Sequence, residues 1–126
     1  MSSRLRTARA EAAQVIKDAG HVAYSHVQAR LTAPAAYIQP GSPYVESTED
    51  STFHHVDIRL EVVVVQRPGE HDKVGLLLDD HIEEVADALV DAGYALEQIS
   101  QPFALEANGA TYPAATITIR TDLEII

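Results

Sequence analysis

The chain contains no cysteine. It can therefore form no disulfide, no thiolate zinc site and no iron–sulfur cluster, and it has no thiol nucleophile. Its fold must rest on a hydrophobic core or on association with other chains. A length of 126 residues, 46% of them hydrophobic, is enough for one core but leaves little room for a second. We expect a single domain that spans residues 1–126.

Positive charge is also scarce, because 9 basic residues stand against 19 acidic ones and give a formal net charge of -10. Such a chain repels phosphate backbones and acidic membrane surfaces, so we expect no sequence-specific nucleic-acid binding. No apolar run is long enough to span a bilayer, and the first residues lack the hydrophobic segment of a secretory signal. We expect the protein to be made in a cytoplasm and not to associate with a membrane.

Motifs that carry chemistry are missing as well. The sequence has neither a glycine-rich phosphate loop nor a Gly-Xaa-Ser-Xaa-Gly elbow. Histidines lie beside carboxylates at three places, which contain His54 with His55, His71, and His81. None has the spacing of a metal-binding motif, so we predict no catalytic residue, no metal site and no cofactor. A small metal-dependent enzyme that uses these histidines and nearby aspartates is the alternative from another class of protein.

Two helices are indicated by apolar residues that recur every three or four positions. The first spans about Ser3 to Ala19 and ends at Gly20. The second has an apolar stripe from Leu78 to Val90, with aspartates and glutamates on its other side, and ends near Gly93.

Strands are indicated on either side of a polar stretch. Pro34 to Pro40 is short, apolar and bounded by prolines, which predicts a short edge strand. Gly41 to Thr52 is polar and turn-rich, which predicts a functional surface loop. Asp57 to Gln66 is the strongest strand; it alternates at first and then becomes continuous valine, so one end is half exposed and the other is buried on both faces.

The last third predicts a hairpin of two strands, Ile99 to Ala107 and Thr111 to Thr121. They are joined through Asn108 and Gly109, a dipeptide that readily supplies the two positive φ angles of a type I′ turn.

Simple pairing around this turn sets Leu105 opposite Tyr112 and Phe103 opposite Ala114. The apolar residues of the two strands then fall on opposite faces, so we predict a β-bulge near Pro102 or Pro113. The order of elements favours an α+β fold: an antiparallel or mixed sheet of about four strands with two helices packed on one face.

Association is the function that these residues favour. Tyr44, Val45 and Phe53 are the apolar groups able to anchor the segment from Gly41 to His55, which we expect to be flexible in the free subunit and buried against a partner. Leu123, Ile125 and Ile126 make the end of the sequence apolar and supply a second surface for partners.

Five pieces of the sequence follow one another in a recognisable order. They are the N-terminal helix, the segment from Pro34 to Tyr44, the Thr52-Phe53 entry to the strand from Arg59 to Val65, the acidic leucine-rich helix, and the segment from Tyr112 to Ile119. In this order the chain resembles the tail terminator proteins of long-tailed, siphovirus-type bacteriophages, particularly those that infect actinobacteria. The likeness covers nearly the whole chain.

The resemblance implies a structural virion protein with no catalytic motif. It would form a hexameric ring at the head-proximal end of the tail tube, stop polymerisation of the tube and join the tail to the neck. The implied partners are further copies of the chain, the tail tube protein and a neck or head-completion protein. The implied location is the tail of the virion, after assembly in the host cytoplasm. A head-closure, neck or tail-completion protein of the same particle is the alternative within this class.

Overall fold

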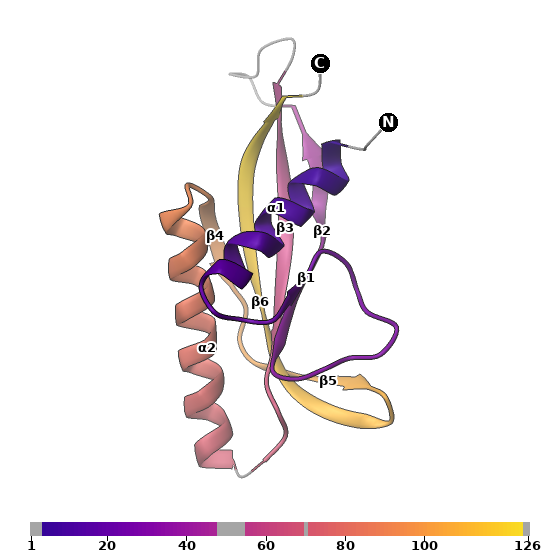
Figure 1. Cartoon of the computed structure of the whole chain (residues 1–126), viewed down its shortest axis with the longest axis vertical. Helices are drawn as coiled ribbons and strands as arrows, with labels where there is room; N and C mark the ends of the chain where they lie inside the picture. Colours follow the sequence, from indigo (N-terminus) through magenta and orange to yellow (C-terminus); the bar gives the residue numbers. More distant parts are fainter. Residues whose placement is uncertain (1–3, 48–54, 70, 125–126) are drawn as a thin grey trace.

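A mixed sheet of six strands with two helices makes up the described chain (Figure 1). The computed structural model describes residues 4–47, 55–69 and 71–124. The elements in chain order are α1 (Arg4–Asp18), β1 (Ala23–Tyr24), β2 (Ala35–Glu46), β3 (His55–Val65), α2 (His71–Asp91), β4 (Ala95–Ile99), β5 (Phe103–Ala107) and β6 (Ala110–Glu124). The expected α+β class is confirmed, whereas the expected count of about four strands is too low.

The long strands β2, β3 and β6 form the centre of the sheet. The strand order is β1-β2-β3-β6-β4, and β5 pairs with the first residues of β6. Among the described residues β1 and β2 pair in parallel and all other pairs are antiparallel. Strand β1, which the sequence did not predict, and strands β4 and β5, which it did not distinguish, are two to five residues long and lie at the margins.

Helix α1 packs through alanines. Ala8, Ala12 and Ile16 are buried against the sheet, and the small side chains let the helix lie close to β1 and β2. The helix ends where Gly20 adopts a φ of 95°, with its amide donating to the carbonyl of Lys17. The predicted helix from Ser3 to Ala19 is thus confirmed over its described residues.

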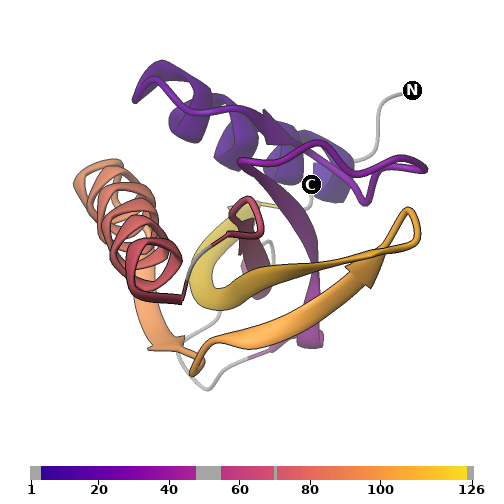
Figure 2. The ribbon, with the colours of Figure 1, turned by 90° about the horizontal axis from the view of Figure 1, so that it is seen from below.

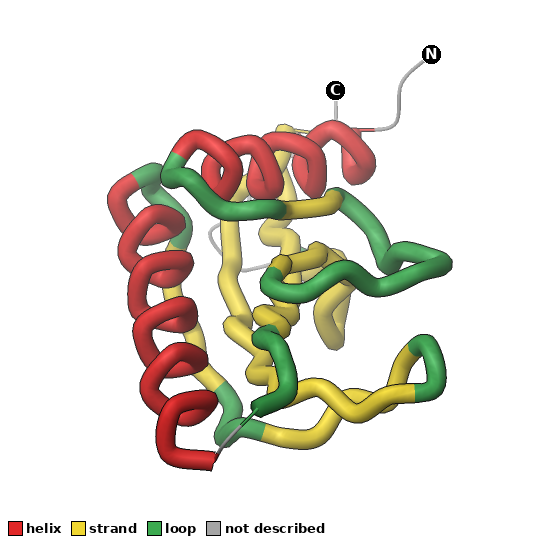
Figure 3. The backbone as a smooth tube through the Cα atoms, turned by 60° about the horizontal axis from the view of Figure 1, so that its bottom comes forward, coloured by secondary structure: helices red, strands yellow, loops and turns green. Residues whose placement is uncertain are grey.

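Helix α2 covers the rest of the same sheet face. Its buried stripe includes Leu78, Val85 and Leu89, and it contacts β3, β4 and β6. Figures 2 and 3 show both helices on one side of the sheet; in Figure 3, α1 runs across the top and α2 down the left. The prediction of two helices packed on one face is confirmed.

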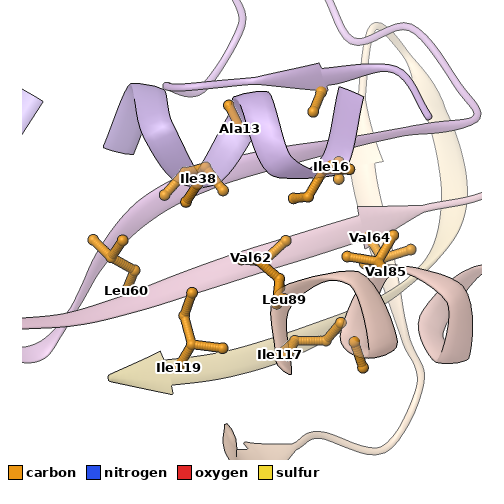
Figure 4. Close-up of a cluster of buried hydrophobic side chains, with 14 of the residues drawn as sticks. Ala13, Ile16, Ile38, Leu60, Val62, Val64, Val85, Leu89, Ile117 and Ile119 are labelled. Atoms are coloured by element: carbon orange, nitrogen blue, oxygen red, sulfur yellow. The ribbon is translucent and has the colours of Figure 1, made fainter. Parts of the chain in front are cut away.

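One core joins both helices to the sheet. Figure 4 shows side chains from α1, α2, β2, β3 and β6 converging between the layers. Ile58, Leu60, Val62 and Val64, every second residue of β3, point into this core and are fully buried.

A second, smaller cluster lies on the opposite face at one end of the sheet. Tyr37, Val63, Val65 and Ala114 are buried there, and Leu31 packs against them from the connection between β1 and β2. The valine run is therefore buried on both faces at the end of β3, as its composition predicts.

Strand β2 continues through the segment that the sequence predicted as a loop. The register with β3 passes from Pro40 opposite Leu60 to Val45 opposite Ile58, so residues 41–44 face Arg59 alone. Glycine, serine and proline here form an irregular bulge within a strand. The loop prediction is wrong for residues 41–46, and residues 48–54 lie outside the described part of the chain. The strand is also longer than predicted, and β1 covers its edge at Ala36 and Tyr37.

The hairpin turn is confirmed. Asn108 and Gly109 have φ values of 54° and 74°, and Leu105 pairs with Tyr112 as expected. The predicted bulge near Pro102 or Pro113 is wrong, because β5 and β6 pair without a shift from Phe103 opposite Ala114 to the turn.

The predicted strand from Ile99 to Ala107 is observed from Phe103 onward as β5, whereas Ile99 is the last residue of β4, most of which the sequence did not predict. Residues 100–102 separate the two strands, and β4 pairs with a later part of β6 than β5 does. The irregularity lies in β4 instead, between Leu96 and Gln98. No bulge near the prolines is needed, because β6 has apolar contacts on both faces: Ile117 faces the helices and Ala114 faces the second cluster.

Candidate functional site

The two candidate partner-binding residues of the predicted loop that can be described lie in β2. Val45 is exposed, as a partner-binding residue should be. Tyr44 packs against the main core, and its hydroxyl oxygen is buried without a hydrogen-bond partner among the described residues. Tyr44 therefore already contributes to the fold of its own chain. Phe53 lies outside the described residues.

Of the three candidate residues at the apolar end of the sequence, only Leu123 can be described. Leu123 lies in β6, opposite Val56 of β3, and is half-buried against the main core. Ile125 and Ile126 lie outside the described residues.

The structure adds association surfaces that the sequence did not single out. Strand β4 ends the sheet, so its outer edge is unpaired within the described chain, and Leu96 and Ile99 on it are exposed. An unpaired edge is a ready template for another strand. The sequence analysis began its strand at Ile99, so it did not recognise Leu96 and Ile99 as exposed residues of a strand at the sheet edge.

A further apolar surface lies where α2 begins. Pro68, Val74, Phe103 and Tyr112 help to line an open hollow of about 370 Å³. Leu76 and Leu77 of α2 are 67% and 53% exposed. The sequence placed both leucines near the helix but gave no sign that they point away from the core.

An ion-pair network covers the sheet face opposite the helices. The Arg59 guanidinium is hydrogen-bonded to both carboxylate oxygens of Glu97, and Glu46 lies 3.6 Å from it. Arg120 lies 3.9 Å from Glu97. The hydrogen bond and charge of Arg59 lower the pKa of Glu97, and Glu97 in turn raises the pKa of Arg59. Because these charges are paired with one another across β2, β3, β4 and β6, the network holds the marginal strand β4 to the central strands of the sheet.

Two histidines meet between the helices. The rings of His21 and His81 stack with centroids 5.2 Å apart, and His21 Nε2 lies 3.3 Å from a carboxylate oxygen of Glu84. His81 is 6% exposed, and its Nδ1 has no hydrogen-bond partner among the described residues. Burial, together with the charge of His21, lowers the pKa of His81 to about 4. A neutral His81 thus serves as a packing ring at the junction of α2 with the chain after α1.

The remaining candidates for metal ligation do not converge in the part of the chain that can be examined. His54 lies outside the described residues, and the side chains of His55 and His71 are not described. Over residues 4–47, 55–69 and 71–124, no group of three or more histidine, aspartate or glutamate side chains is arranged to hold a metal ion. Within the same residues, neither helix is long and apolar enough to cross a membrane.

The sequence matches no protein-family model, and it has no significant similarity to a curated protein.

Proposed function

We propose that this chain is a structural protein of a long-tailed bacteriophage, the tail terminator. In this role it forms a hexameric ring on the head-proximal end of the tail tube, ends polymerisation of the tube and joins the tail to the neck. The ordered likeness of nearly the whole sequence to tail terminators suggests the role. The unpaired outer edge of β4, with Leu96 and Ile99 exposed on it, carries the proposal structurally, because an uncovered strand edge favours association.

The shape of the fold supports a ring rather than a catalytic pocket. Both helices lie on one sheet face, and an ion-pair network lies on the other. The margins of the sheet and the start of α2 are therefore the surfaces that we propose for contact with partners. Identical subunits that join through different margins form a closed ring when the rotation between them closes.

The proposed partners are further copies of the chain, the tail tube protein and a neck or head-completion protein. We assign Val45, with the undescribed Phe53, Ile125 and Ile126, to the surfaces that meet them, whereas Tyr44 and Leu123 pack against the core of their own chain. The location follows from the role: the tail of the virion, after assembly in the host cytoplasm. The net charge of -10 suits a ring through which DNA passes without being held.

The test is the mass of the protein in solution, with and without the tail-tube subunit of the same phage. A hexamer is expected at working concentration or after the tube subunit is added. Electron microscopy of tails made without this protein should show tubes of irregular length. A monomer under both conditions, together with tails of normal length, would contradict the proposal. A hexamer at the neck with uniform tubes in its absence would point instead to a head-closure or tail-completion role.

A further inference from the structure

The backbone of β6 alternates between the strands on its two sides. The N–H of Ser100, just after β4, donates to the carbonyl of Thr116, whereas the N–H of Gln66, just after β3, donates to the carbonyl of Pro113. Even-numbered residues of β6 therefore turn their N–H and C=O groups toward β4 and β5, and odd-numbered residues turn theirs toward β3. This alternation decides which backbone groups of β4 are left at the edge of the sheet.

Leu96 and Ile99 are the residues of β4 whose backbone groups point away from β6. They lie opposite Ile119 and Ile117, the odd-numbered residues whose groups turn toward β3. Residues of this kind are normally two positions apart, but here they are three apart, because the irregularity between Leu96 and Gln98 adds one residue. The open edge of β4 therefore presents two N–H and two C=O groups at an unusual spacing, and no other strand of the described chain pairs with it there.

The same two residues carry exposed apolar side chains. Leu96 is 43% and Ile99 41% exposed. Because opposite residues of a sheet point to the same face, both side chains lie on the helix face, next to the core residues Ile119 and Ile117. Figure 2 shows α2 on that face and no other described element beyond β4. Strand β4 also lacks lysine and proline, the residues that commonly protect an edge strand from pairing.

The other open edges of the described sheet do not match β4. The edge of β2 is covered by β1 over two residues, and further along it contains Pro40 and Pro43, which have no N–H to donate. On β5 the outward groups belong to Ala104 and Glu106, which are two positions apart instead of three. The strand that has the same spacing as β4 is β4 of a second copy.

Two β4 strands fit each other in one antiparallel register. When Leu96 lies opposite Ile99 of a second copy, Ile99 lies opposite its Leu96, and the outward N–H and C=O groups of both copies are all paired. The two apolar pairs then meet on the helix face. In this register Glu97 lies beside the neutral Gln98 of the second copy. A shift by one residue would set the two Glu97 carboxylates opposite each other and leave the outward backbone groups unmatched.

We propose that the outer edge of β4 pairs in antiparallel fashion with β4 of a second copy of this chain, with Leu96 opposite Ile99. The contact uses the same surface on both copies, so it closes at two and joins their sheets into one. This pair is a form of the free chain and goes beyond the proposed ring. Because it covers the edge that supports the ring proposal, the pair must open before the tail is capped.

The absence of cysteine makes a disulfide test of this register clean. Leu96→Cys and Ile99→Cys are made as separate variants and mixed in equal amounts under mild oxidation. The mixture should give a covalent dimer on a denaturing gel, because the Cα atoms of such opposite residues lie about 5.5 Å apart, within reach of a disulfide. Each variant alone should give at most about a tenth as much, because its two cysteines lie three residues apart along the strands, roughly 10 Å.

The edge of β5 provides the matched control for chance collisions. Ala104→Cys and Glu106→Cys stand at the outward positions of that strand, and their mixture under the same oxidation should give no covalent dimer. As much dimer from Leu96→Cys alone as from the β4 mixture, or as much from the β5 mixture, would overturn the proposed register.

Lysine substitutions test the same contact without oxidation. Leu96→Lys and Ile99→Lys should each raise the dimer dissociation constant at least about tenfold in analytical ultracentrifugation, because a charge replaces an apolar contact at the paired edge. Val45→Lys, at a residue of β2 with the same 43% exposure as Leu96, should leave it unchanged. Thermal unfolding checks that the three variants remain folded. Wild-type dimerisation by both β4 variants would overturn the proposal.

The results separate this inference from the proposed function. A wild-type chain that is a dimer alone and a hexamer with the tube subunit supports both. A hexamer without the tube subunit, with no disulfide from the β4 mixture, overturns the β4 pair and leaves the ring standing. A dimer that crosslinks as expected but stays a dimer with the tube subunit, while tails made without the protein have normal length, overturns the ring and leaves the pair. A chain that is monomeric at every concentration and gives no disulfide overturns the pair, and addition of the tube subunit then decides the ring.

Discussion

Gly41→Ala should destabilise the chain, although the new side chain is a single methyl group. A Cβ at this position would lie 2.6 Å from the carbonyl oxygen of Arg59, 2.7 Å from its Cγ and 2.8 Å from its carbonyl carbon. Two of these atoms belong to the backbone of β3, so rotation of a side chain cannot relieve the contact and the two strands must separate. Overpacking of this kind costs about 1–3 kcal/mol. For a domain of this size we expect the melting temperature to fall by roughly 5–10 °C.

The same substitution elsewhere in the chain provides the control. Gly75 is an exposed residue of α2, and a Cβ there would meet nothing within 4 Å. Gly75→Ala should stabilise the chain by about 0.5–1 kcal/mol, because alanine favours the helix and loses less backbone entropy on folding. Thermal unfolding followed by circular dichroism should therefore show opposite shifts for the two variants. If Gly41→Ala melts at or above the wild-type temperature, β2 and β3 do not approach as closely at the bulge as the structure indicates.

Three further predictions concern the titration of one histidine, the core and the net charge. His81 takes up a proton near pH 6.5 in the unfolded chain but only near pH 4 in the folded chain. The contribution of neutral His81 to the free energy of unfolding is therefore present in full above pH 6.5 and should fall by roughly 3 kcal/mol as the pH decreases to 4. His81→Phe, which keeps a ring against His21, should make the urea midpoint nearly independent of pH between 6.5 and 4. If the midpoint still falls as steeply as in wild type, other groups cause the pH dependence. Leu60→Ala should lower the free energy of unfolding by about 2–5 kcal/mol and Val90→Ala by less than about 1 kcal/mol, since only Leu60 is fully buried; equal losses would contradict the assigned core. Six copies with a net charge of -10 each should not bind duplex DNA in a filter-retention assay at moderate salt, and tight, salt-sensitive binding would contradict the proposed passage of DNA through the ring.

Sequence patterns predicted α1, α2 and β3 well because each of these elements follows one pattern along its length. Both helices keep an apolar stripe against the sheet, and β3 alternates until its valine run is covered on both faces. The Asn108-Gly109 turn was equally predictable, since its φ angles are a local property of these two residues.

The errors arose where tertiary contacts override local composition. Gly41, Ser42 and Pro43 predict a loop by themselves, but β3 holds them in a bulge opposite Arg59. The short strands β1 and β4 form because β2 and β6 have edges with which they can pair. A pattern of two to five residues cannot predict such a pairing.

The candidate site was predictable only in part, because exposure depends on packing. Val45 is exposed as expected, but Tyr44 and Leu123 pack against the core, and the exposed Leu76, Leu77 and Phe103 were not singled out.

The placement of Tyr44 changes how its role must be tested. The sequence predicts Tyr44 as an anchor of a segment that is flexible in the free subunit and buried only against a partner. In the structure its ring packs against the main core, so Tyr44→Ala should cost about 1–3 kcal/mol in the isolated subunit. Irregular tails from that variant would then report unfolding as much as lost contact with a partner.

Tyr44→Phe separates the two effects. It keeps the ring and removes a hydroxyl whose oxygen is buried without a hydrogen-bond partner among the described residues. Because an unsatisfied buried hydroxyl is destabilising, the phenylalanine variant should be as stable as wild type or up to about 1–3 kcal/mol more stable in urea unfolding. Normal tails from Tyr44→Phe, with irregular tails from the exposed Val45→Ser variant, would assign the partner contact to Val45 and the structural role to the Tyr44 ring. A phenylalanine variant that is clearly less stable than wild type would mean that the hydroxyl is hydrogen-bonded in the folded subunit, which would contradict this expectation.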